Sequence, residues 1–136
     1  MNFFLSLISL ISLAGCCKVH CDGTELGISF EKFKARDTDT VLFISYLPGS
    51  GQTQMADSFR ILSAISPTDT SKSSIAHSIS SKYDWKVFLP SLNKQYVFEG
   101  FELNADKCRC GGAQYKYITG FLVNGIRKEG MFIRLD

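Results

Sequence analysis

Cysteine is the residue type in this chain with the widest choice of chemistry. The five cysteines are Cys16, Cys17, Cys21, Cys108 and Cys110. Such a density in a short chain favours an oxidising compartment, where thiols pair into disulfides. The first cysteine, Cys16, follows an uncharged apolar run from Phe3 to Leu13 that ends in small residues. This pattern is typical of a secretory signal peptide, so we expect the chain to be exported.

The apolar run is too short to cross a membrane, because as a helix it rises about 16 Å against a hydrocarbon core of about 30 Å. Its end, Leu13-Ala14-Gly15-Cys16, resembles the lipobox of bacterial lipoproteins. The resemblance implies a signal peptide over residues 1–15, a diacylglycerol on the Cys16 thiol and an acylated new amino terminus. Two or three acyl chains would anchor the protein stably in the membrane. The alternative is ordinary signal-peptide cleavage between Ala14 and Gly15.

A wider resemblance covers most of the chain loosely. The segments 13–18, 33–41 and 83–94 are similar to small lipoproteins of the Bacteroidetes type. The resemblance implies a location in the cell envelope and a β-rich fold, and it implies no catalytic residues. No Asp follows Cys16 and no acidic run comes after it, so we expect the lipid-anchored protein at the outer membrane, facing the periplasm.

With Cys16 acylated, the other four cysteines are disulfide candidates. Four cysteines permit three pairings, and the sequence does not select one. Pairing Cys108 with Cys110 would strain the bond. Cross-pairing with Cys17 and Cys21 would close loops of about 90 residues, which stabilises a fold more. The same thiols could bind zinc together with His20, but the Cys-x-Cys spacing is too tight, so we expect no metal and no cofactor.

Length and charge favour one ordinary domain. Removing the first 15 residues leaves 121 of the 136, enough for a single core. The 15 basic and 13 acidic residues are balanced and dispersed, unlike the basic stripe of nucleic-acid-binding proteins. Turn residues recur about every ten positions. We therefore predict an all-β fold, with an arm over residues 16–27 and a single domain over 28–136. The domain is expected to be an antiparallel β-sandwich of seven or eight strands, immunoglobulin-like or transthyretin-like. A closed small barrel is the alternative.

Alternation and turn signals place the strands. In Asp84–Leu89, alternate residues from Trp85 share one face, Pro90 ends the strand, and Trp85 is the natural centre of the core. Asn124-Gly125 between two apolar runs predicts a closing hairpin, because a type I′ turn needs positive φ at both positions. The other expected strands cover residues 28–33, 41–47, 58–65, 75–79, 96–103, 115–123 and 126–135.

Other polar motifs favour turns over chemistry. Asp37 and Asp39 lack the further oxygen ligands of a calcium loop. Gly49-Ser50-Gly51 lacks the Gly-Lys-Ser/Thr of a phosphate loop. His77 stands among serines without a Gly-x-Ser-x-Gly elbow. We therefore predict no catalytic residue.

Two hypotheses of function follow, with a hydrolase around His77 as a distant third. The first is a non-enzymatic structural or partner-binding module of the envelope, which binds a protein through an exposed strand edge or loop end. The second is a periplasmic protein that binds a small ligand or glycan through exposed aromatic side chains, for which Phe88, Tyr96 and Tyr115 are the candidates. A flat apolar edge would favour a partner, and a shallow aromatic platform would favour a ligand.

Overall fold

The computed structural model describes residues 23–107 and 114–136, and this part is built from strands and two short 3-10 helices. The strands are β1 (Glu25–Ser29), β2 (Thr40–Tyr46), β3 (Met55–Leu62), β4 (Ala76–Ser80), β5 (Asp84–Leu89), β6 (Lys94–Lys107), β7 (Gln114–Val123), β8 (Ile126–Glu129) and β9 (Phe132–Arg134), and the 3-10 helices are η1 (Ala35–Thr38) and η2 (Pro90–Leu92). The all-β prediction is confirmed, with nine strands in the described part instead of seven or eight.

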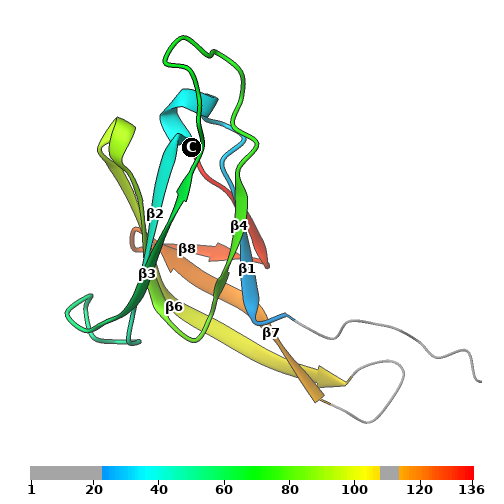
Figure 1. The fold of residues 1–136 in the computed structure, drawn as a ribbon. Helices are drawn as coiled ribbons and strands as arrows, with labels where there is room; N and C mark the ends of the chain where they lie inside the picture. Colours follow the sequence, from blue (N-terminus) through cyan, green and yellow to red (C-terminus); the bar gives the residue numbers. More distant parts are fainter. Residues whose placement is uncertain (1–22, 108–113) are drawn as a thin grey trace, which may run out of the picture.

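The strands form two sheets of unequal width. The larger sheet has the order β3-β2-β5-β6-β7-β8, and the smaller has the order β4-β1-β9. Only β1 and β9 pair in parallel; the other pairs of described strands are antiparallel. The two sheets face each other across the core, as Figure 1 shows for β1 and β4 opposite β2 and β3. The arrangement is a β-sandwich with one narrow layer.

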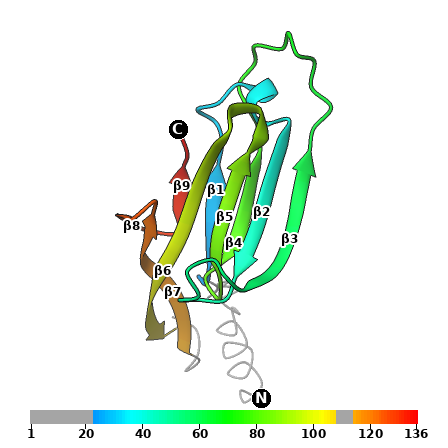
Figure 2. The same cartoon turned by 90° about the vertical axis from the view of Figure 1, so that its left-hand side faces the viewer.

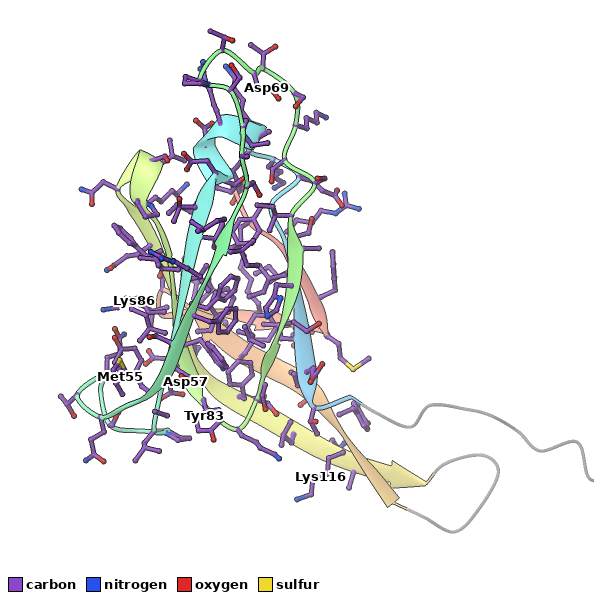
Figure 3. The ribbon with its side chains drawn as sticks, viewed as in Figure 1. Met55, Asp57, Asp69, Tyr83, Lys86 and Lys116 are labelled. Atoms are coloured by element: carbon purple, nitrogen blue, oxygen red, sulfur yellow. The ribbon has the colours of Figure 1, made fainter. Side chains whose placement is uncertain are left out.

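The core lies between the sheets and is filled by alternate residues of each strand. In β5 the exposure alternates as predicted, with Trp85, Val87 and Leu89 buried and Lys86 on the outer face, where Figure 3 shows it pointing away from the interior. The largest fully buried side chains are Phe30, Phe43, Phe98 and Phe121. Trp85, predicted as the centre of the core, is also buried but is 8% exposed, slightly more than these four residues. Its indole N–H donates to the Ser80 carbonyl at 2.8 Å.

The predicted hairpin at Asn124-Gly125 is confirmed, with φ of 50° and 78° at the two positions, and it joins β7 to β8. It is not the last element. The expected strand over 126–135 breaks at Gly130, where φ is 98°, and the chain then leaves the larger sheet. After this break β9 pairs with β1 of the smaller sheet, so the last strands connect the two layers.

Two other strands are shifted along the sequence. β1 begins at Glu25, and the expected continuation past Ser29 is a turn in which the Phe33 N–H donates to the Phe30 carbonyl at 2.9 Å. β3 begins at Met55, because its first residues pair with the end of β2 and lengthen the strand. The β1 start also lies three positions before the expected domain boundary at residue 28.

Close backbone approach joins β1 to β7 where the described chain begins. Gly23 forms a parallel bridge with Tyr117, and its carbonyl accepts the Ile118 N–H at 2.9 Å. A Cβ at Gly23 would lie 2.6 Å from the Tyr117 Cβ and 2.9 Å from its Cα. Because the obstacle includes backbone, neither chain can yield cheaply, and only glycine fits.

We expect Gly23→Ala to lower the free energy of unfolding by about 1–3 kcal/mol, since the bridge must open to admit the methyl group. Chemical denaturation of the full chain measures this loss. Thr24→Ala is the control and should change the stability by less than about 0.5 kcal/mol. If Gly23→Ala were as stable as the original chain, the backbones at Gly23 and Tyr117 would not be in tight contact.

Candidate functional site

The cysteines and His20 lie outside the described residues, so the predicted lipidation and disulfides concern parts that the structure does not describe. The position of Tyr115 falls in β7, while its side chain also lies outside the described part. These residues therefore remain sequence predictions.

The other two aromatic candidates lie on opposite faces of the larger sheet. Tyr96 pairs with Val87 and is 5% exposed on the inner face. Phe88 is the next residue after Val87 and points to the outer face, where it is half-buried. Adjacent strand residues face opposite sides, so Phe88 and Tyr96 do not form one aromatic platform.

His77 fills an aromatic cluster at the seam between the edges of β3 and β4. Its ring centroid lies 5.0 Å from those of Phe43 and Phe59, and Phe59 also contacts Trp85 at 6.2 Å. Within the described residues the imidazole makes no hydrogen bond to a serine or a carboxylate. The arrangement is that of a packing residue and gives no nucleophile–base pair.

The remaining polar motifs hold turns together. The Asp37 N–H donates to the Lys34 carbonyl at 3.0 Å in η1, and the Asp39 carboxylate accepts the Ser91 hydroxyl at 2.6 Å. Gly49 has a φ of 72° in the β2–β3 turn, and its N–H donates to the Asp84 carboxylate at 2.9 Å. Across residues 23–107 and 114–136, no group of three or more His, Cys, Asp or Glu could hold a metal ion.

The first candidate surface is the outer edge of β3. This strand pairs with β2 alone, and Figure 2 shows it at the border of the larger sheet with no strand beyond it. Met55 is 65% exposed, Leu62 62% and Phe59 36%. A strand edge presents unpaired N–H and C=O groups, and apolar side chains beside them favour contact with another chain.

The second candidate surface is a groove between β8 and β9, with a volume of about 530 Å³. We call it the β8–β9 groove; its lining includes Lys32, Lys94, Tyr96, Lys128, Phe132 and Asp136. Its size is within the range of small-molecule sites, about 300–1,000 Å³. Sequence reasoning missed it, although the position of Lys128 on the inner face follows from counting along the hairpin from Asn124-Gly125.

Electrostatics at one end of the groove centre on Asp136. Its carboxylate lies 2.9 Å from the Lys32 ammonium, while its carbonyl oxygen accepts hydrogen bonds from Lys94, at 2.5 Å, and from the Tyr96 hydroxyl. The hydrogen bond and charge of Lys32 hold the pKa of Asp136 below its ordinary value, with smaller contributions from Lys94 and Lys128. Burial raises the pKa of the Tyr96 hydroxyl.

No protein family, no curated protein and no solved structure matches this chain. In the described residues, no helix has the length and apolar character needed to cross a membrane. What the chain does must therefore be inferred from its own residues.

We expect Lys32→Gln to raise the pKa of Asp136 toward its ordinary value, because the main group that favours the carboxylate form is lost. The ion pair between Lys32 and Asp136 is fully formed at a pH above the ordinary pKa of an aspartate. It is lost as the pH falls through the lowered pKa of Asp136. NMR titration of the Asp136 carboxyl carbon measures the change. In Lys86→Gln, the control on the outer face, the pKa of Asp136 should stay lowered; an unchanged value in Lys32→Gln would contradict the ion pair.

Proposed function

We propose that this chain is a lipid-anchored envelope protein that binds a protein partner through the edge of β3 and catalyses no reaction. One observation carries the proposal: an eight-residue strand edge that pairs on one side only and exposes Met55 and Leu62. A partner segment that adds to this edge would satisfy its backbone groups and cover the apolar side chains.

Comparison of the sheet's two edges supports this choice. β8 has four residues, of which Arg127, Lys128 and Glu129 are charged. Short length and charge protect an edge strand against association. β3 has eight residues, of which Asp57 and Arg60 alone are charged. The β3 edge is therefore the less protected of the two, which is what a strand-adding partner requires.

Asp57 gives the edge some selectivity. It pairs with Ser45, whose side chain is buried, so it belongs to the inward-facing register of β3 while remaining exposed. Figure 3 shows Asp57 and Met55 near the same end of the strand. An inward-pointing charge disfavours indiscriminate pairing, and a partner that brings a basic residue opposite Asp57 would be preferred.

The membrane anchor in this proposal rests on the sequence Leu13-Ala14-Gly15-Cys16. A diacylglycerol on Cys16 would hold the domain at the envelope, and the outer membrane facing the periplasm is the proposed location. The alternative function, glycan or ligand binding by Phe88, Tyr96 and Tyr115, is disfavoured because Phe88 and Tyr96 lie on opposite faces of the sheet.

We expect the chain recovered from membranes to begin at Cys16 and to carry diacylglycerol and an N-acyl group. Intact-mass spectrometry measures both, and comparison of reduced with non-reduced protein counts the disulfides. Cys16→Ser should move the protein into the soluble fraction, whereas Cys17→Ser should leave it in the membrane. Native protein that is soluble and begins at Gly15 would contradict the anchor.

We expect a photo-crosslinking residue at Ser58, in the middle of β3, to give a discrete adduct in cells that make this protein. Met55→Lys combined with Leu62→Lys should remove the adduct without changing the melting temperature, because both side chains are exposed. Leu103→Lys, at a 43% exposed position on β6, is the matched control and should retain it. An adduct that survives the double substitution would show that Met55 and Leu62 do not hold the partner, and the absence of any adduct at Ser58 would place the partner elsewhere.

A further inference from the structure

The β8–β9 groove has an excess of positive charge that its own acids do not neutralise. The basic residues that line it are Lys32, Lys94, Lys128 and Arg134, and the acidic ones are Glu129 and Asp136. The Glu129 carboxylate is engaged by Arg127 at 2.5 Å, and the Arg134 guanidinium lies 3.6 Å from the Glu31 carboxylate. Within the described residues, Lys128 has no ion-pair partner. The groove therefore offers at least one cation to an external anion.

The direction of Lys128 follows from the register of the hairpin. Lys128 pairs with Phe121, which is 1% exposed and belongs to the core, so both side chains lie on the inner face of the larger sheet. Ile126 pairs in the same way with Val123, which is 7% exposed. Lys128 and Ile126 therefore line the groove side by side, a cation next to an apolar group.

The opposite wall is also apolar. Ile126 on β8 is 63% exposed although it lines a concave site, and Ile133 on β9 lines the same groove. Ile133 pairs with Ile28, which is 0% exposed, so the Ile133 side chain lies on the inner face of the smaller sheet. The neighbouring Phe132 pairs with Gly27, and its ring lies on the outer face of that sheet. Apolar side chains on both walls of a groove indicate a ligand with an apolar part.

The structure already shows how the groove receives oxygen ligands. Lys32, Lys94 and Tyr96, which we call the cradle, bind the carboxylate and carbonyl oxygens of Asp136. Lys94 is held in place by the Tyr96 ring, whose centroid is 5.4 Å from its ammonium nitrogen. The cradle is therefore ordered around the side-chain carboxylate and the main-chain oxygen of one residue, and an external carboxylate can bind beside them.

We propose that the β8–β9 groove binds a small amphipathic carboxylate, with its anionic head at Lys128 beside the cradle and its apolar tail between Ile126 and Ile133. The site is separate from the β3 edge and does not depend on the partner proposed there. A compact head is required because Asp136 already fills part of the cradle. A tail of several carbons gains most from the two apolar walls.

Isothermal titration of the soluble Cys16→Ser chain with monomeric decanoate tests the proposal. We expect saturable binding of one decanoate, much weaker binding of acetate, which lacks the tail, and no binding of decyltrimethylammonium, which reverses the charge. Binding of the cationic amphiphile as tight as that of decanoate would overturn the proposal. So would sedimentation of the Cys16→Ser chain with phosphatidylglycerol vesicles without saturable decanoate binding, since the groove would then recognise a membrane surface.

Single substitutions test where the anionic head of the ligand binds. Lys128→Gln should weaken decanoate binding about tenfold, because a charge-assisted contact is lost. Lys116→Gln, on the extended β6–β7 ribbon in Figure 3, is the control and should change the affinity by less than about twofold. Asp136→Asn should tighten binding about threefold, because it removes the competing negative charge. Equal affinity in Lys128→Gln and Asp136→Asn would overturn the placement of the head.

Discussion

The structure depends on burying the inner face of a six-stranded sheet under a sheet of only three strands. Over the central strands the cover is complete, and inward residues such as Phe43 and Phe98 are 0% exposed. At the margins it fails: Phe59 on β3 is 36% exposed and Ile126 on β8 is 63% exposed, although both occupy inward positions. Apolar surface left at a margin costs free energy unless something covers it. Both surfaces argued to bind other molecules lie where the smaller sheet ends.

The two margins of the larger sheet, at β3 and at β8, differ in what connects them to the smaller sheet. At the β3–β4 margin, the Phe59 and His77 rings pack against each other across the gap between the sheets, and the backbone edge of β3 stays unpaired with β4. At the β8–β9 margin, the chain itself crosses from one sheet to the other through Gly130. This crossing leaves a groove, because β8 stays with the larger sheet while β9 joins the smaller one. A strand edge suits an extended peptide, and a groove suits a small molecule.

Local signals predicted much of this fold. The β5 strand and the Asn124-Gly125 hairpin follow from alternation and turn chemistry within a few residues, and both were placed correctly. The division of the last strand was not predicted, because Gly130 has no neighbouring turn residue and the pairing of β9 with β1 is a long-range contact. The groove was missed for the same reason. Lys32 and Asp136 are 104 positions apart, and nothing in the local pattern joins them. The β3 edge was foreseen only as a general feature, since strand order is set by long-range contacts.

The proposed anchor fixes how these surfaces would face the envelope. Gly23 follows Cys16 by seven residues, a reach of at most about 25 Å, so with the proposed anchor the end of the sandwich where Gly23 meets β7 would lie near the membrane. β1 runs away from Gly23, and β9 runs parallel to it, so the chain reaches Asp136 at the opposite end. With the proposed anchor, the cradle would face the aqueous compartment. β3 runs along the length of the sandwich in Figure 2, so its edge is accessible to a partner from the side. The proposed anchor at one end would therefore leave both surfaces exposed at the same time, and a partner on β3 need not block the groove.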